Sequence, residues 1–452
     1  MACPTHPRRP GRSLLCAGIA FVAAAGCAGP GESAAKGVAA DSVANSPSCP
    51  GDNGGITLPA GFCATVFADS VGGARHIAVA PNGDVFVQLI AARQVSESGT
   101  SAKGGILAMR DRNRDGKADS SVLFGEIGGT GIAVRGAWLY SDEKSRIVRY
   151  PLTPGSLTPS GSAETIVSGL PTGGHGSRNI AIDSGGSALY VNVGSRTNSC
   201  QQKDRGLESA GVDPCTELDT RAGLWRFDAG KTGQSFGTSA RFATGIRNGM
   251  GLTINPLDGK VYTTQHGRDQ LFQNWPKLYD AVRSAENPAE EFMQVNQGDD
   301  FGWPYCYFDV GAKKLLLAPE YGGDGVKVDR CAGKKPPLVW FPGHWAPMSS
   351  AFYTGNQFPA RYRGGVFIAF HGSWNRAPQP QAGYRVVFVP LSNGSPGGAY
   401  ETFSDGFAGG QLQPATAKHR PTGLAVSPDG SLFITDDSGG RIWRVTYTGG
   451  RR

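Results

Sequence analysis

The chain has 452 residues, 39% of them apolar and 9% aromatic, which is enough for one large domain or for two or three ordinary ones. Its 67 glycines and 30 prolines are spread among β-branched and aromatic residues. This composition favours many short strands joined by tight turns and argues against a disordered or long-helical chain. The formal net charge is +7, but no basic cluster with interleaved aromatic residues occurs, so we expect no nucleic-acid partner.

The first 27 residues have the pattern of an export signal. Arg8, Arg9 and Arg12 precede an apolar stretch that is too short to span a membrane, and small residues follow up to Cys27. We therefore expect residues 1–27 to be a signal peptide and the mature chain to be periplasmic or otherwise extracytoplasmic. Two outcomes stay open at Cys27: lipidation, which would anchor the chain to a membrane, or ordinary cleavage and release.

Residues 28–48 consist mainly of Ala, Gly, Ser and Pro and have almost nothing to bury. This composition predicts a flexible linker. The folded domain is expected to span residues 49–452.

The cysteines that follow the signal fall into three pairs that are close in sequence. None has the CxxC spacing of a zinc site, and an exported chain meets an oxidising compartment. We therefore predict three disulfides, Cys49–Cys63, Cys200–Cys215 and Cys306–Cys331.

After the linker, one pattern recurs six times: an apolar run, a turn that is often Pro-Asn-Gly or Pro-Asp-Gly, and a second apolar run. The copies span residues 76–87, 131–140, 179–191, 251–262, 350–369 and 422–434. Further apolar runs lie between the copies. Six units of about four strands each predict an all-β protein, a six-bladed β-propeller of four-stranded antiparallel blades. We expect the long spacing at residues 267–343 to be a structured loop region over one face, not a second domain.

Polar residues precede four of the repeated strands. They are His175 with Arg178, Arg247 with Asn248, His344, and Arg420. Because the strand that opens each repeat lies nearest the axis of a propeller, these side chains are expected to converge at one mouth of the central channel. The alternative is that they are loop residues satisfied by backbone carbonyls.

Four segments carry a family resemblance, His175–Arg178, Gly245–Gly249, Phe301–Cys306 and Phe370–Arg376. Together with the blade repeats, they resemble the PQQ-dependent glucose/sorbosone dehydrogenases, and the last segment resembles the sorbosone-dehydrogenase-like branch. The resemblance implies oxidation of a sugar, either an aldose or a sorbosone-like substrate, with PQQ and calcium as cofactors.

The same resemblance implies roles for individual residues. His175 would be the general base that removes the proton of the substrate hydroxyl while hydride passes to the C5 carbonyl of PQQ, a task that suits imidazole. Arg247 would stabilise the oxyanion at C5, and Asn248 and Arg420 match cofactor contacts; His344, at the same mouth, is a further cofactor-binding candidate. Glucose-oxidising relatives have a Lys near the position of His371, so His371 or Arg376 is a candidate to supply that cation.

Two segments are candidates for calcium. The resemblance implies that the backbone carbonyls of Gly267 and Arg268 bind the catalytic ion, as hard cations prefer oxygen. A separate loop carries alternating oxygen side chains, Asp111, Asn113, Asp115 and Asp119, and resembles the first part of a calcium loop. Val122 stands where the final acid would be, so an acidic hairpin turn is an equal alternative to a structural calcium site.

Two other classes of function stay open, a metal-dependent propeller lactonase and a non-catalytic extracytoplasmic binding propeller. The lactonase would need several inward carboxylate and Asn ligands, whereas the predicted mouth is cationic. No CxxCH haem-attachment motif occurs, so a dehydrogenase of this kind would pass its electrons to a separate acceptor. The sequence does not identify the sugar.

Overall fold

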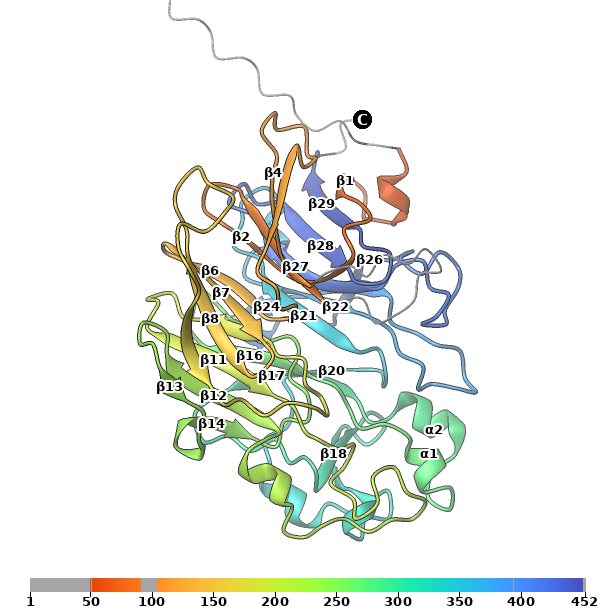
Figure 1. Cartoon of the computed structure of the whole chain (residues 1–452). Helices are drawn as coiled ribbons and strands as arrows, with labels where there is room; N and C mark the ends of the chain where they lie inside the picture. The colour runs from red at the N-terminus through yellow and green to blue at the C-terminus, as the bar shows by residue number, and fades with distance from the viewer. Residues whose placement is uncertain (1–48, 50, 91–103, 393, 450–452) are drawn as a thin grey trace, which may run out of the picture. The chain divides into compact units, whose positions relative to one another are not determined.

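Six antiparallel sheets form the blades of a β-propeller in the computed structural model, which describes residues 49, 51–90, 104–392 and 394–449 (Figure 1). The predicted fold class is therefore confirmed. The signal peptide, the possible acylation site Cys27 and the linker at residues 28–48 lie outside the described residues.

Each blade has four strands that pair in order from the axis outward. The innermost strands are β2 (Gly73–Val79), β6 (Ile132–Arg135), β10 (Ile180–Ile182), β15 (Thr253–Ile254), β21 (Pro347–Phe352) and β27 (Pro421–Val426). The second strands are β3 (Val85–Ile90), β7 (Trp138–Glu143), β11 (Ala188–Val193), β16 (Val261–Gln265), β22 (Val366–Phe370) and β28 (Leu432–Asp436). The third strands are β4 (Gly105–Arg110), β8 (Arg146–Pro151), β12 (Gly223–Asp228), β17 (Glu290–Val295), β23 (Arg385–Val389) and β29 (Ile442–Tyr447). The outermost strands are β5 (Ser120–Phe124), β9 (Glu164–Ser168), β14 (Arg241–Thr244), β20 (Val339–Phe341), β26 (Glu401–Ser404) and β1 (Phe62–Ala68).

The ring of blades closes through the two ends of the folded domain. Neighbouring innermost strands contact one another in the order β2, β6, β10, β15, β21, β27 and back to β2. The last blade takes its outermost strand from the start of the domain, since β1 pairs antiparallel with β29, and Figure 1 shows the two side by side. This closure leaves only short outer edges exposed to other chains.

The six predicted copies correspond to the first two strands of the six blades. Two of the predicted turns need glycine because their backbone has a positive φ, 89° at Gly83 and 86° at Gly430. In each turn the glycine N–H donates to a carbonyl three residues earlier, that of Ala80 or of Ser427. Local turn chemistry thus sets the strand pairing of these hairpins.

Aromatic side chains fill the space between the last two blades. Phe367 and Phe403 pack with ring centroids 4.7 Å apart, and the fully buried Trp443 donates its indole N–H to the carbonyl of Gly54. Both faces of strands such as β22 and β28 are buried, because each blade lies between two others. Burying one such ring stabilises the fold by roughly 1.5–3 kcal/mol.

The long segment at residues 267–343 is only partly what the sequence predicts. It does contain loops, two short helices, α1 (Leu271–Asn274) and α2 (Ala281–Glu286), and a hairpin of β18 (Cys306–Asp309) and β19 (Lys314–Leu317). However, β17 and β20 within it complete the fourth blade, so describing the whole segment as a loop region was wrong. The apolar runs of these two strands are short and separated by 43 residues of other structure, which hid their pairing.

The remaining short elements lie in connections between strands. They are β13 (Gln234–Ser235), which adds to β9 in parallel, the pair β24 (Leu391–Ser392) and β25 (Ser395–Pro396), and the 3-10 turns η1 (Asn53–Gly55), η2 (Thr216–Asp219), η3 (Thr238–Ala240), η4 (Pro319–Tyr321), η5 (Asp329–Gly333) and η6 (Ala360–Tyr362).

All three predicted disulfides are present. The Cα atoms lie 5.6 Å apart in Cys49–Cys63, 6.2 Å in Cys200–Cys215 and 5.8 Å in Cys306–Cys331. Disulfides persist in oxidising compartments, which agrees with the predicted export.

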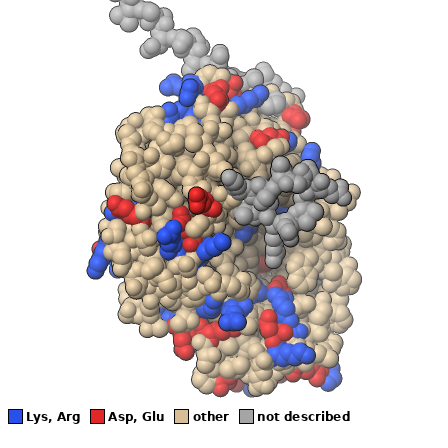
Figure 2. Space-filling model, viewed as in Figure 1, with Lys and Arg blue, Asp and Glu red and all other residues tan. Residues whose placement is uncertain are grey.

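Within the described ranges, no helix has both the length and the apolar character needed to cross a membrane. Basic and acidic side chains are interspersed on the face shown in Figure 2.

Candidate active site at one mouth of the propeller

Residues from five blades are linked at the end of the channel where the innermost strands begin. The guanidinium of Arg75, in the first blade, lies 2.7 Å from the carboxylate of Asp437 and 3.1 Å from the hydroxyl of Ser177. His266 joins the fourth blade to the fifth through the carbonyl of Pro347, at 2.9 Å. Polar groups of these five blades therefore meet at this mouth.

His175 presents one ring nitrogen for chemistry. Its Nδ1 lies 2.9 Å from Oγ and 3.1 Å from the backbone oxygen of Ser195. Because Ser195 Oγ donates its own proton to the carbonyl of Thr197, both Ser195 oxygens face Nδ1 as acceptors, so Nδ1 carries the ring proton. Nε2 has no hydrogen-bond partner among the described residues and keeps a free lone pair. This is the tautomer that a proton acceptor needs.

Burial, reinforced by the positive charge of Arg247, lowers the pKa of His175 to about 3. We therefore predict that, in the protein without PQQ, the ring stays neutral at pH 5, where a free imidazole would be protonated. The unfolded chain takes up the proton at higher pH than the folded chain. His175 thus lowers the stability of the fold as the pH falls from about 6.5 toward 3. The ¹⁵N shifts of its ring should be the same at pH 7 and pH 5, and a midpoint near 6.5 would contradict the assignment.

Arg247 is buried, and its guanidinium is fully engaged within the protein. Nε donates to the backbone oxygen of Asn198 at 3.0 Å, and Nη2 donates to Asn198 Oδ1 and to the carboxylate of Asp269, both at 3.0 Å. Nη1 donates to the carbonyl of Gly267 at 2.9 Å and approaches that of His266 at 3.5 Å. All five N–H groups thus have acceptors, and the side chain is rigidly held.

Asp269 is the charge partner of this arginine. Besides Arg247, it binds Arg205 at 2.7 Å and accepts a hydrogen bond from Asn375 at 2.8 Å. Burial alone would raise its pKa, but Arg247 and Arg205 hold it well below the ordinary value for Asp. Asp269 is therefore ionised and joins three segments that are far apart in sequence.

Asn248 lies next to His175 and His266. Its Nδ2 is 3.3 Å from Nδ1 of His266, and its Oδ1 is buried without a hydrogen-bond partner. A Cβ at Gly194 would lie 2.7 Å from Cβ of His175 and 3.3 Å from Oδ1 of Asn248. Only glycine fits between these two side chains, and the buried Oδ1 of Asn248 is an acceptor that the described residues leave unused.

A second cluster surrounds Asp437. Its carboxylate accepts from Nε2 of His371 at 2.7 Å and from Arg75, and Arg420 donates to the carbonyls of His371 and Gly372. Nη1 of Arg420 has no partner among the described residues, and Nε of Arg75 is buried without one. Arg420 therefore keeps a donor that the described residues do not use, whereas the unused donor of Arg75 is buried.

His344 and Arg376 are bonded to the region around α2. Nε2 of His344 lies 2.9 Å from the carbonyl of Ser284, and its Nδ1 is 3.1 Å from the amide of Asn375. Arg376 donates to Ala285, Gly343 and Pro380 carbonyls and pairs with Glu286. Backbone carbonyls therefore accept most of the hydrogen bonds that these two side chains donate, which is the alternative considered for the residues at the mouth.

The two calcium candidates differ in their surroundings. The carbonyl of Gly267 accepts from Arg247, whereas that of Arg268 accepts no hydrogen bond from the described residues; the Arg268 side chain is buried against Glu320.

In the other loop, between β4 and β5, Asp119 accepts from the backbone of Arg112, and Asp111 pairs with Arg444. Asn113 and Asp115 bond to each other, the pattern of the hairpin-turn alternative. Among the described residues, no three His, Cys, Asp or Glu side chains are grouped to hold a metal.

A family model described as TrAA12-like matches residues 56–448. The chain belongs to the TrAA12-like family. A protein of Borreliella burgdorferi with no assigned function is 28% identical over 275 residues, which are 60% of this chain and 61% of that protein. The PQQ-dependent pyranose dehydrogenase of Coprinopsis cinerea is 25% identical over 246 residues, 46% of this chain and 31% of that enzyme. The chain thus covers less than two thirds of either relative.

Solved structures share the fold of this TrAA12-like chain. The AA12 carbohydrate-active enzyme of Trichoderma reesei has a TM-score of 0.70 at 18% identity, with 87% of this chain and 98% of that chain covered. The PQQ domain of the Coprinopsis cinerea pyranose dehydrogenase, in its holo form, has a TM-score of 0.68 at 21% identity, with 86% and 97% covered. The sorbosone-dehydrogenase-like branch suggested by one sequence segment is not part of these findings.

Sequence reasoning missed several residues of the TrAA12-like mouth. Ser195, His266 and Asp437 each follow a second strand of a blade, as the predicted His371 does, and Asp269 lies shortly after β16. In an antiparallel hairpin the end of the second strand lies beside the start of the first, so both ends reach the same mouth. Reading the residues after each second strand, as well as before each first strand, would have found them.

Proposed function

We propose that this protein is an oxidoreductase, a PQQ-dependent sugar dehydrogenase that works outside the cytoplasm. The observation that carries the proposal is Nε2 of His175, which has no hydrogen-bond partner among the described residues, in a ring whose Nδ1 is bound by Ser195. The name of the Coprinopsis relative, a PQQ-dependent pyranose dehydrogenase, supports the same chemistry.

The side chains at the mouth fit the chemistry of PQQ, which carries three carboxylates and a quinone. Carboxylates need fixed cationic donors, and Nη1 of Arg420 and Nε of Arg75 have no partners among the described residues. The buried Oδ1 of Asn248 is an acceptor without a donor. We assign Arg420, Arg75 and Asn248 to cofactor binding, together with His371, which Asp437 orients. For His344 and Arg376 we propose a supporting role, because the protein itself satisfies their polar groups.

PQQ, when bound, would supply the acceptor for the hydride of the substrate. His175 Nε2 would take the proton of the substrate hydroxyl, and the Ser195 oxygens would hold the resulting imidazolium in place. Arg247 has no open N–H, so its contribution would be its buried positive charge, which favours negative charge developing nearby. Calcium would bind the carbonyl of Arg268, which accepts no hydrogen bond from the described residues. It would also bind the carbonyl of Gly267 if the hydrogen bond from Arg247 to that carbonyl breaks.

Reconstitution tests the proposal directly. Purified protein is loaded with PQQ and calcium and is then offered aldoses, sorbosone-like dicarbonyls and polyols with an artificial electron acceptor. We expect PQQ-dependent reduction of the acceptor with at least one sugar. If no substrate supports turnover although PQQ binds, the protein is a binding propeller rather than a dehydrogenase. Hydrolysis of a lactone without PQQ would instead indicate a lactonase.

Removing the Arg420 guanidinium is expected to weaken PQQ affinity about tenfold or more. A hydrogen bond to a charged group contributes about 1.5–3 kcal/mol, and 1.4 kcal/mol is a factor of ten in affinity. Spectroscopic titration of Arg420→Ala with PQQ measures the change. Arg361→Ala is a matched control, because Arg361 is exposed and pairs with Glu401. Wild-type affinity in a folded Arg420→Ala variant would remove Arg420 from the cofactor site.

A further inference from the structure

One short segment contacts both candidate catalytic side chains. Residues 195–198 follow β11, and Ser195 at the start of the segment binds Nδ1 of His175 through two oxygens. At its other end, Asn198 accepts from Nε and Nη2 of Arg247 and from the backbone N–H of Asp269. The Asn198 amide also donates to the carbonyl of Asp269 at 2.9 Å. Four consecutive residues therefore set the positions of the base and of the arginine.

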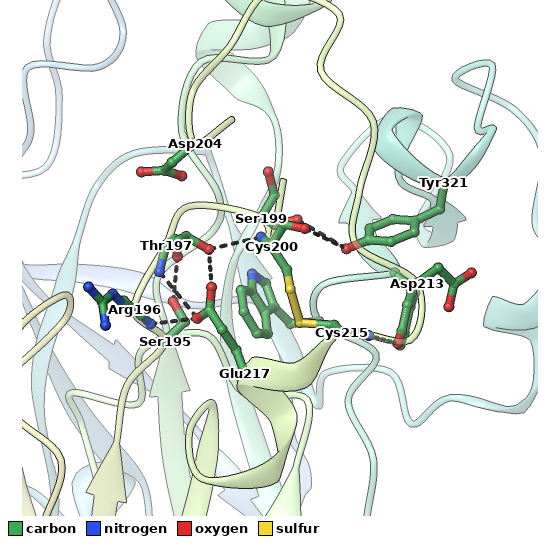
Figure 3. Close-up of a disulfide and its surroundings, with 12 residues drawn as sticks. Ser195, Arg196, Thr197, Ser199, Cys200, Asp204, Asp213, Cys215, Glu217 and Tyr321 are labelled. Atoms are coloured by element: carbon green, nitrogen blue, oxygen red, sulfur yellow. Dashed lines mark hydrogen bonds between the residues drawn. A yellow bond between two sulfur atoms is a disulfide. The ribbon is translucent and has the colours of Figure 1, made fainter. Parts of the chain in front are cut away.

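The segment has no regular structure of its own and is held from outside by Glu217 (Figure 3). The Glu217 carboxylate accepts from the N–H of Arg196 at 2.7 Å, from the N–H of Thr197 at 3.2 Å and from the Thr197 hydroxyl. The same hydroxyl accepts from the N–H of Cys200 at 3.0 Å. Glu217 thus satisfies the backbone donors that a loop without strand pairing would leave open.

The disulfide Cys200–Cys215 joins the two sides of this arrangement. Figure 3 shows it beside Thr197 and Glu217. Cys215 is also fixed by its N–H, which donates to the hydroxyl of Tyr305 at 2.8 Å, and both cysteines are buried. Residues 201–214, which the disulfide closes into a loop, are also bonded to other parts of the protein, through Arg205 to Asp269 and through the N–H of Gly211 to the carbonyl of Glu320.

We propose that Ser195 positions His175 and that Asn198 positions Arg247. Glu217 holds the segment that carries both residues, and the disulfide Cys200–Cys215 fixes Glu217 relative to that segment. The catalytic role of His175 in this proposal rests on the function proposed above. The hydrogen-bond geometry around His175 does not depend on that function. In this proposal, the disulfide Cys200–Cys215 has a role in the active site beyond the stability that any such crosslink provides.

The chain offers a matched control. Cys49–Cys63 and Cys200–Cys215 close loops of nearly equal length, with sequence separations of 14 and 15. Constraint of the unfolded chain depends on loop length, so removing either crosslink should change thermal stability by a similar amount. Only Cys200–Cys215 adjoins the segment that holds His175, whereas Cys63 lies in β1 at the outer edge of the last blade.

The experiment compares the double variants Cys200→Ser/Cys215→Ser and Cys49→Ser/Cys63→Ser, with Glu217→Gln as a second variant in case the first fails to fold. In the protein without PQQ at neutral pH, ¹⁵N shifts report which ring nitrogen of His175 carries the proton. We expect the wild type and the Cys49/Cys63 variant to be protonated at Nδ1 alone. The Cys200/Cys215 and Glu217 variants should show a mixture of tautomers.

In the reconstituted enzyme, we expect kcat to fall on the order of 10- to 100-fold in the Cys200/Cys215 and Glu217 variants, with KM little changed, since a misplaced base slows the chemical step. The Cys49/Cys63 variant should keep its kcat. An unchanged tautomer and an unchanged kcat in the folded Cys200/Cys215 and Glu217 variants would overturn the proposal. If the tautomer changes as expected but the wild type shows no turnover with any sugar, the positioning stands and the proposed function fails.

Discussion

Replacing His175 with glutamine is expected to lower turnover by roughly 10²–10⁴-fold, the range typical of losing general acid–base catalysis. Glutamine can keep a hydrogen bond to Ser195 but cannot accept a proton as imidazole nitrogen does. PQQ and calcium binding should survive, because Arg420, Arg75 and the Arg268 carbonyl do not depend on His175 for their positions. The measurement is kcat with the best substrate of the sugar screen, after cofactor loading has been verified by absorbance.

His76→Gln is a suitable control for this variant. His76 is also buried, and its pKa is likewise lowered, to about 4, mainly by burial. Both of its ring nitrogens are bonded within the protein, to Asn179 and to the carbonyl of Met348. The His76→Gln variant should therefore change the stability of the fold and leave the rate of the chemical step unchanged. A loaded His175→Gln enzyme that reduces the acceptor at nearly the wild-type rate would end the assignment of His175 as base.

Replacing Glu320 with glutamine is expected to lower the free energy of unfolding by about 3–5 kcal/mol, because removing one partner of a buried ion pair leaves an uncompensated charge. Its partner is Arg268, and the two side chains are 0% and 3% exposed. Glu320 also accepts from the hydroxyl of Ser199 at 3.2 Å and from the indole of Trp275 at 3.0 Å. Denaturant unfolding measures the loss, and weaker calcium binding should accompany it, because Arg268 carries the candidate carbonyl ligand.

Glu208→Gln gives the contrast for this prediction. Glu208 pairs with Lys277 in the same region, but the two side chains are 38% and 80% exposed. An exposed pair of this kind contributes about 0–1 kcal/mol, so the control should unfold almost as the wild type does. Equal losses of unfolding free energy in the two variants would contradict the prediction that the buried Arg268–Glu320 pair contributes more than the exposed pair.

Local sequence patterns were sufficient for the blades but not for the whole site. The turn glycines Gly83 and Gly430 and the apolar runs beside them predicted the inner hairpins, because strand pairing across a tight turn depends on neighbouring residues alone. The pattern before each inner strand also found His175, Arg247 and Arg420. It did not find Asp269 or Asp437, because both follow a second strand. Arg75, the partner of Asp437, comes from another blade, whereas Arg247, the partner of Asp269, precedes the first strand of the same blade.

The amino-acid sequence alone therefore determined the six-bladed architecture, the three local disulfides and the positions of the residues that open each blade. These features depend on periodicity, turn chemistry and short loop closures, all of which act over a few residues. Only the tertiary structure decided that β17 and β20 belong to the fourth blade and that Arg247 is fully paired with Asp269 and Asn198. It also decided that Ser195 fixes the tautomer of His175. Closing the ring of blades brings together residues that are distant in sequence, and which donor meets which acceptor there depends on packing that no local pattern records.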